Sequence, residues 1–242
     1  MRAPRLHHPG PLAGRGEVAL PEAALRHLRV LRLRPGAALV LFDGRGGQWR
    51  AELLPGGRAR LLEHQPLERE APLPVHLAQA PGRGERMDWA LQKAVELGAA
   101  GIQPVWTARS TPPLEGQRLA RRLRHWRAVV AAACEQCGRN RLPEVAPPLP
   151  LERWLAGLGP PAAGELRLAL SPGGGLRLRE LSAPTGPVRL LVGPEGGLAP
   201  EELERAEACG FRPLTLGPRV LRTETAGPAA LAALQALWGD LG

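Results

Sequence analysis

The sequence of 242 residues has three cysteines, a single lysine and no long apolar run. Three cysteines are too few for the disulfide framework of a small secreted protein. A membrane-spanning helix needs roughly 18 consecutive apolar residues, and no segment comes near that length. The N-terminal stretch MRAPRLHHPGPLAG also lacks the apolar core of a signal peptide. We therefore expect a cytoplasmic protein without a membrane segment.

Several common binding motifs are missing as well. No glycine-rich loop is followed by G-K-[ST], which excludes a Walker phosphate loop, and no G-x-G-x-x-G indicates the usual dinucleotide-binding fold. Cys134 and Cys137 form a lone C-x-x-C pair, with no second cysteine pair or paired histidines to complete four zinc ligands. Their spacing places them on one face of a predicted helix. We expect no metal site.

The chain carries a formal net charge of +9, and Lys93 is its only lysine, so the basic residues are almost all arginine. One explanation is a codon bias that favours Arg, Ala, Gly, Pro and Leu together. The other is phosphate binding, because guanidinium groups suit phosphate and stack on bases. Residues 1–70 hold 12 arginines against 7 acidic residues. This concentration of charge favours a nucleic-acid-binding module in the N-terminal third.

Residues 1 to about 66 have the pattern of a small β-rich domain. FDGRGGQW (42–49) is a hairpin signal, because Asp-Gly forms tight turns between strand-forming residues. A short helix is expected over 21–31, with Pro21 in its first turn. Several short strands predict a small barrel. The polar segment 64–74 contains three prolines and is expected to be a linker.

From residue 75 onward, strand patterns alternate with helix patterns. Such alternation indicates a parallel sheet covered by helices on both faces. We expect Thr225 to cap the last helix, since Pro228 then lies in its first turn. The expected strands are 75–80, 101–107, 166–171, 187–193 and 212–217, and the expected helices are 85–98, 114–138, 150–158, 200–210 and 225–238.

Two loops rich in glycine and proline each follow an apolar strand directly. We call GPEGG (193–197) the first loop and GPRVLRTET (217–225) the second loop. Glycine lets a backbone approach a ligand closely, and ligands of open α/β sheets lie outside the carboxyl ends of the strands. The loops, with Glu195 in one and Arg219 and Arg222 in the other, therefore predict two walls of one pocket. The simpler alternatives are a tight strand-to-helix turn and a surface ion pair between Arg222 and Glu224.

Two arginine-rich segments have both a structural and a functional interpretation. Residues 109–127 contain six arginines and one acidic residue, so they provide either a solvated helix face or a phosphate-tracking surface. Residues 135–143 (EQCGRNRLP) form either a polar helix terminus or a loop whose amide and guanidinium groups face a base edge. The arginines concerned are Arg118, Arg121, Arg122 and Arg124 in the first segment, and Arg139 and Arg141 in the second.

Four segments of the chain resemble the RsmE family of SPOUT methyltransferases, which methylate N3 of a uridine in bacterial 16S ribosomal RNA. They are HLRVLRLRPG with LFDGRGGQW, LQKAVELGAAGIQPVWTARS, AAACEQCGRNRLP, and LLVGPEGG with LGPRVLRTETA. They span most of the chain in the order that the family has, and the last pair is the most specific. The departures are mild: Leu198 stands where an aromatic is usual, and Cys137 replaces a small hydroxyl residue.

The resemblance implies a small PUA-like β-barrel over residues 1–68 that binds RNA, and a SPOUT α/β domain over residues 69–242. The second domain would have a mostly parallel sheet and a deep trefoil knot, and it would form a homodimer. The substrate would be 16S ribosomal RNA of the small ribosomal subunit, and S-adenosylmethionine the cofactor. By motif, the cofactor-binding residues are Leu170, Ser171, Gly193, Pro194, Glu195, Gly196, Leu216, Gly217, Pro218, Leu221, Arg222 and Thr225. The candidate RNA-binding residues are Arg118, Arg121, Arg122, Arg139 and Arg141.

Methyl transfer to uracil N3 needs no covalent enzyme intermediate, whereas attack at C5 typically uses a cysteine thiolate. The three cysteines lie in or at the ends of predicted helices, and none has the setting of a nucleophile. We expect Arg222 to stabilise negative charge on the uracil carbonyl oxygens. Glu195 or Glu224 would accept the N3 proton. Two alternatives remain open: a ribose 2′-O-methyltransferase of the same superfamily, and a non-catalytic RNA-binding protein of ribosome assembly.

Overall fold

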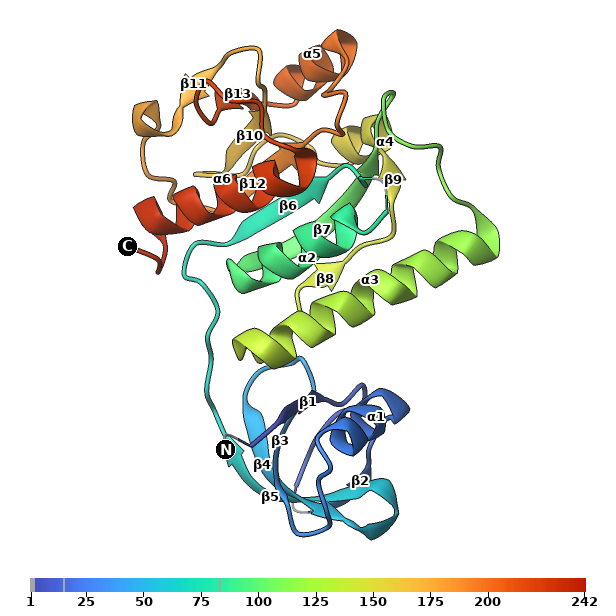
Figure 1. Ribbon diagram of the computed structural model, residues 1–242. Coiled ribbons are helices and arrows are strands. Elements are labelled where there is room, and N and C mark those ends of the chain that lie inside the picture. Colours follow the sequence, from blue (N-terminus) through green and yellow to red (C-terminus); the bar gives the residue numbers. More distant parts are fainter. Residues whose placement is uncertain (1–2, 15, 83) are drawn as a thin grey trace. The chain divides into compact units, whose positions relative to one another are not determined.

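The computed structural model describes residues 3–14, 16–82 and 84–242 (Figure 1). The chain divides into two compact units, one made of Met1–Glu70 with Ala131–Leu142 and the other of Ala71–Val130 with Pro143–Gly242. Each unit is built around its own sheet. Residues 131–142 therefore belong with the N-terminal unit, although they lie far from it in sequence.

The N-terminal unit is a curled five-stranded sheet with one helix. Its strand order is β1-β3-β4-β5-β2, with β1 and β3 parallel and the other pairs antiparallel. Since β1 and β2 are the two edges of this order, the described strands form a curled half-barrel, where a small barrel was expected. The elements are β1 (Arg5–His7), β2 (Glu17–Ala19), α1 (Glu22–Val30), β3 (Ala38–Phe42), β4 (Gln48–Leu54), η1 (Pro55–Gly57) and β5 (Arg58–Gln65).

Apolar residues that alternate along the strands form the core of this unit. Successive strand residues point to opposite faces, so Leu39 and Leu41 of β3 face inward together with Leu61 of β5, and Leu28 of α1 packs in the same cluster. The predicted hairpin over 42–49 is confirmed as the turn between β3 and β4. Three of its residues are glycines with φ between +65° and +114°, a region that side chains disfavour.

The second unit has a fully parallel sheet, as the alternating pattern predicted. Its strand order is β11-β13-β10-β12-β6-β7-β8, with β9 paired to β7. The strands are β6 (Val75–Gln79), β7 (Ala99–Trp106), β8 (Glu144–Val145), β9 (Leu149–Pro150), β10 (Leu166–Leu170), β11 (Leu176–Arg177), β12 (Val188–Val192) and β13 (Arg212–Thr215). The helices are α2 (Arg86–Glu96), α3 (Gly116–Cys137, which continues into the first unit), α4 (Leu151–Ala156), η2 (Leu178–Glu180), α5 (Pro200–Ala208) and α6 (Thr223–Trp238).

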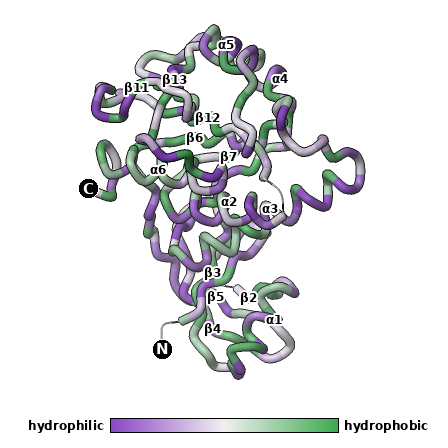
Figure 2. Tube along the Cα trace, turned by 45° about the horizontal axis from the view of Figure 1, so that its top comes forward, coloured by the Kyte–Doolittle hydropathy of each residue, from purple (hydrophilic) through white to green (hydrophobic). Residues whose placement is uncertain are grey.

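Helices cover both faces of this sheet. Helices α2 and α6 pack side by side on one face (Figure 1). On the other face, Trp154 of α4 and Ala206 of α5 pack against Ala78, Val105 and Leu191 of the central strands. Apolar residues follow the strands, whereas much of α3 is hydrophilic (Figure 2). Among the described residues, no helix combines the length and apolar character needed to cross a membrane.

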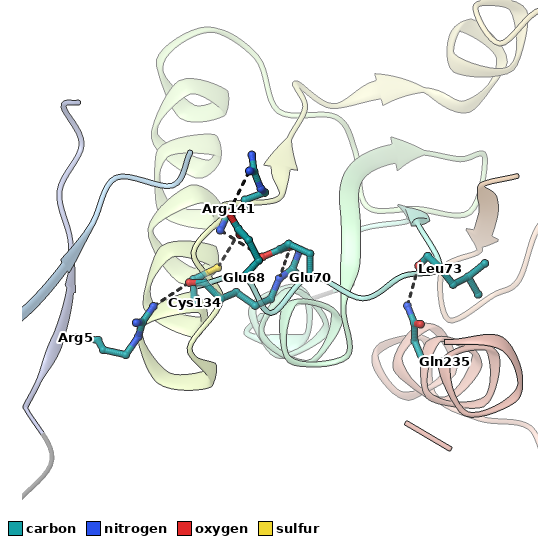
Figure 3. Close-up of polar contacts among 8 residues, drawn as sticks. Arg5, Glu68, Glu70, Leu73, Cys134, Arg141 and Gln235 are labelled. Atoms are coloured by element: carbon teal, nitrogen blue, oxygen red, sulfur yellow. Dashed lines mark hydrogen bonds and ion pairs between the residues drawn. The ribbon is translucent and has the colours of Figure 1, made fainter. Parts of the chain in front are cut away.

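The last helix begins earlier than the sequence suggested, because its N-cap lies three residues before the expected Thr225. Helix α6 starts at Thr223 with Arg222 as its N-cap, so Thr225 is not the cap. Pro228 then lies inside the helix and cannot donate to the carbonyl oxygen of Glu224. Near the other end of α6, the buried Gln235 side chain donates from Nε2 to the carbonyl oxygen of Leu73 at 3.0 Å (Figure 3). This bond fixes α6 to the segment that leads into β6.

Candidate active site

The two glycine-rich loops are tied together by one buried hydroxyl. Thr223 Oγ1 donates to the carbonyl oxygen of Gly193 at 2.6 Å and accepts a bond from Gln79 Nε2 at 3.0 Å. Gln79 ends β6 and is 1% exposed, and Thr223 is 5% exposed. Because Gly193 opens the first loop and Thr223 belongs to the second, this hydroxyl fixes both loops at the same sheet edge. The sequence analysis missed both Thr223 and Gln79.

The first loop uses its glycines for close packing at Gly193 and for a positive φ at Gly197. A Cβ on Gly193 would lie 3.0 Å from the backbone nitrogen of Leu198. Gly197 has φ of +69° and donates its N–H to the carbonyl oxygen of Pro194 at 2.8 Å, which closes a turn. Arg109, beyond the end of β7, donates from Nη1 to the carbonyl oxygen of Gly196 at 2.7 Å. The first loop is therefore held by Arg109 as well as by its own turn hydrogen bond.

A cavity of about 60 Å³ lies between the ends of β10 and β13, the second loop and α6. It contains Leu170, Ser171, Leu216, Gly217 and Leu221 among its walls, five of the residues predicted to bind a cofactor. The backbone N–H of Ser171 donates to the carbonyl oxygen of Leu214 at 2.9 Å, which joins the two strand ends. The other lining residues are Pro172, Leu214, Thr215, Arg219 and Ala226. Apolar side chains with a few polar backbone groups are the usual lining of a small-molecule site.

The three predicted catalytic residues lie around one further arginine. Arg86, the first residue of α2, is ion-paired with Glu195, and its Nε lies 3.7 Å from Glu224 Oε1. Arg222 Nη1 lies 4.0 Å from the same Glu224 oxygen. The Arg222 side chain is 77% exposed, whereas that of Glu224 is 13% exposed. Arg86 gave no signal in the sequence, because an arginine in the first turn of a helix has no special spacing.

The remaining predicted cofactor residues occupy different settings. Pro194 is buried in the first loop, where its carbonyl oxygen accepts the bond from Gly197. Pro218 is exposed in the second loop, and Thr225 is half-buried in the first turn of α6. Neither Pro218 nor Thr225 lines the cavity as far as the structure describes it.

The arginines of α3 form an open surface within the second unit. Arg118, Arg121 and Arg122 are exposed and line a broad depression of about 670 Å³ together with His125. His125 is held by Asp88 of α2, with 2.6 Å between Nε2 and Oδ2. Three guanidinium groups along one helix face are accessible to a polyanion here.

Arg139 and Arg141, in the N-terminal unit, have different surroundings. Arg139 is 5% exposed and ion-paired with Glu70, so its guanidinium group does not reach the surface. Arg141 is exposed, and its Nη2 lies 3.1 Å from Glu68 Oε1 (Figure 3). Between them, the buried Asn140 accepts a bond from Arg5 Nη2 at 2.8 Å. The segment is thus anchored on the half-barrel, and Arg141 alone of the two arginines is open to a ligand.

The buried Cys134 of this unit has an unreactive thiol. Burial raises the pKa of the Cys134 thiol to about 12, so it stays protonated near neutral pH. Its Sγ lies 3.8 Å from the carbonyl oxygen of Arg141 (Figure 3). This setting agrees with the expectation that Cys134 is no nucleophile. In the described part of the chain, no three potential metal ligands lie close enough together to hold a metal ion.

Comparison with known proteins identifies the family of this chain. The family model of an RNA methyltransferase domain matches residues 69–235, and that of an RNA methyltransferase PUA domain matches residues 20–61. The chain belongs to the RNA methyltransferase family. A Synechocystis protein named ribosomal RNA small subunit methyltransferase E is 39% identical over 230 residues, which are 91% of this chain and 73% of that protein. The expected family is thereby confirmed.

Two solved structures of relatives show the same fold with a ligand. The ribosomal RNA small subunit methyltransferase E of Neisseria gonorrhoeae, bound to S-adenosylmethionine, is 40% identical with a TM-score of 0.90. A methyltransferase of Legionella pneumophila in complex with S-adenosylmethionine is 37% identical with a TM-score of 0.92. Each match covers 100% of both chains.

Proposed function

We propose that this protein is an S-adenosylmethionine-dependent methyltransferase of small-subunit ribosomal RNA, and that its acceptor is N3 of a uridine in 16S ribosomal RNA. The observation that carries the proposal is the Thr223 hydroxyl, which ties the first loop to the second beside the cavity. The Neisseria gonorrhoeae relative is bound to S-adenosylmethionine, and both it and the Synechocystis relative bear the name ribosomal RNA small subunit methyltransferase E.

The residues fit the cofactor that the relatives bind. Leu170, Leu216 and Leu221 offer apolar contact to an adenine ring, while Ser171 and Gly217 offer backbone polar groups. Gly193, Pro194, Glu195 and Gly196 of the first loop would hold the remainder of the molecule, together with Arg222, Pro218 and Thr225 of the second loop. When bound, S-adenosylmethionine supplies an electrophilic methyl group.

The chain's own residues prepare the acceptor. The side chain of Arg222 is 77% exposed, so it can reach a uracil carbonyl oxygen and stabilise the negative charge left when N3 loses its proton. Glu195 accepts that proton in our proposal, because it lines an open pocket, whereas the Glu224 side chain is only 13% exposed. Holding N3 in line with the methyl group supplies the rest of the rate enhancement.

RNA binding would use both units. Arg118, Arg121 and Arg122 of α3 would track phosphates, and Arg141 would do so from the N-terminal unit. Arg139 is left out of this set because Glu70 holds it in the interior. We propose residues 1–68 as the PUA-like RNA-binding domain and residues 69–242 as the SPOUT catalytic domain, which would carry a trefoil knot and form a cytoplasmic homodimer.

The experiment is methyl transfer to 16S ribosomal RNA from S-adenosylmethionine with an isotope-labelled methyl group. Digestion of the product to nucleosides shows whether the label is on base or ribose. We expect 3-methyluridine; label on the ribose would support a 2′-O-methyltransferase, and no transfer despite RNA binding would support a non-catalytic protein.

Arg222→Ala should lower turnover about 10²–10³-fold, the range seen when a group that stabilises transition-state charge is removed. Exposed Arg205 of α5, changed to Gln, is the control for loss of one positive charge. Turnover of Arg222→Ala equal to that of the wild type would contradict the assigned role.

A further inference from the structure

A polar pocket lies beside the first loop and shares no lining residue with the cavity of about 60 Å³ described above. It has a volume of about 280 Å³ and is lined by Arg86, Arg109, Ser110, Thr111, Glu195 and Gly196. These residues follow β6, β7 and β12, which are neighbours in the sheet. The pocket therefore sits at the carboxyl edge of three adjacent parallel strands, where α/β sheets bind their ligands.

Both arginines of this pocket keep donors available. Arg109 uses Nη1 for the carbonyl oxygens of Gly196 and Leu198, and among the described residues no hydrogen bond uses its Nε or Nη2. Arg86 uses Nη1 and Nε for its two carboxylates, and its Nη2 has no hydrogen-bond partner within the described ranges. A guanidinium group presents five N–H donors in a fixed fork, so each side chain can brace the protein and still bind an anion.

The described lining of this pocket is basic, because Arg86 and Arg109 are positively charged and Glu195 is negatively charged. Such a lining attracts an anion such as a phosphodiester. Guanidinium groups bind phosphate oxygens through parallel N–H donors, which makes arginine the residue of choice for this ligand.

We propose that this pocket binds a phosphodiester of the RNA substrate, next to the nucleotide that is methylated, with Arg86 and Arg109 as its ligands. The inference rests on the proposed function and adds a substrate-binding site to it. A phosphate held here presents the attached nucleoside to Glu195, the carboxylate in the pocket wall. Arg86 thereby links phosphate recognition to the position of the proton acceptor, because the same guanidinium group contacts Glu195.

The test compares Arg86→Gln, Arg86→Lys and Arg109→Lys with the wild type, and Arg205→Gln serves as the control for charge. Three quantities are measured: the KM for 16S ribosomal RNA in methyl transfer, the salt dependence of RNA binding, and the Kd for S-adenosylmethionine by calorimetry. We expect Arg86→Gln to raise the RNA KM about tenfold, as the loss of a charged hydrogen bond would. The slope of log affinity against log salt should fall by about 0.7, the value for one phosphate contact on a single strand.

The conservative variants separate charge from geometry. Arg86→Lys should restore the salt slope, and Arg109→Lys should raise the RNA KM without changing that slope, since lysine keeps the charge but loses the fork. The Kd for S-adenosylmethionine should change by less than the RNA KM, because neither Arg86 nor Arg109 lines the cavity between β10, β13 and the second loop. Unchanged RNA KM and salt slope in Arg86→Gln would overturn the proposal. So would weaker S-adenosylmethionine binding with normal RNA affinity, which would assign the pocket to the carboxylate of the methyl donor.

Different measurements would show that the proposed function is wrong. A wild-type protein that binds no S-adenosylmethionine and transfers no methyl group would refute the enzyme assignment. The salt slopes of RNA binding by the wild type and Arg86→Gln would still decide whether Arg86 contacts a phosphate.

Discussion

Replacing Thr223 by valine removes a hydroxyl that joins the two loops while keeping the shape of the side chain. The change leaves the carbonyl oxygen of Gly193 without its donor at 2.6 Å and one N–H of Gln79 without its acceptor at 3.0 Å. Gln79 keeps its bond to the carbonyl oxygen of Ala80. A buried polar group that loses its partner costs about 1–3 kcal/mol. We expect the free energy of unfolding to fall by about 2 kcal/mol.

The same variant should weaken the binding of S-adenosylmethionine. The cavity lies between the second loop and the strand ends, and the Thr223 hydroxyl links the second loop to Gly193 of the first loop. If the substitution lowers the free energy of binding by about 1.4 kcal/mol, the Kd for S-adenosylmethionine rises about tenfold. Urea denaturation and titration calorimetry measure the two effects. Thr185→Val, at an exposed threonine before β12, is the matched control. A Thr223→Val protein with wild-type stability and wild-type affinity would refute the reasoning.

Two further variants test a buried ion pair of the second unit and the packing of the first loop. Glu165 has a side chain that is 3% exposed and lies 2.9 Å from Arg167 Nη2, and its arginine partners and hydrogen bonds hold its pKa at about 2 against the ordinary 4.5. Glu165→Gln should therefore lower the free energy of unfolding by about 3–5 kcal/mol near neutral pH. The difference from the wild type should shrink as the pH falls from 4.5 towards 2, because the native carboxylate becomes protonated there. Urea denaturation at several pH values measures this difference, and a difference independent of pH would contradict the prediction. Gly193→Ala places a Cβ 3.0 Å from a backbone nitrogen, whereas the Cβ of Gly173→Ala has only Ser171 Oγ at 4.0 Å as a neighbour. Calorimetry should show weaker S-adenosylmethionine binding for Gly193→Ala only, and equal affinities would show that the first loop tolerates the added carbon.

Local patterns in the sequence were enough to locate most elements. Helix α5 begins at Pro200 and β12 ends at Val192, as the apolar runs and their glycine and proline boundaries indicated. The parallel sheet followed from the alternation of strands and helices, which is a property of neighbouring segments. The first and second loops were recognisable because glycine and proline restrict the backbone wherever they occur.

The start of α6 depends on contacts with residues that are distant in sequence. Pro228 suggested a helix that begins at Thr225, but α6 starts at Thr223. The hydroxyl of Thr223 is bound to Gly193 and Gln79, which are 30 and 144 residues away in sequence. No pattern within one segment contains such partners, so tertiary contact overrode the position that proline favours.

The sequence by itself determined which segments form strands, helices and glycine-rich loops, because those choices depend on residues close together in the chain. Only the tertiary structure decided the roles of individual charged side chains. Arg139 and Arg141 look equivalent in sequence, yet Glu70 holds the first in the interior while the second is exposed. Arg86 became part of the site only because folding set it against Glu195, 109 residues away. The environment of a charge depends on which distant residues surround it, and chain folding alone fixes those neighbours.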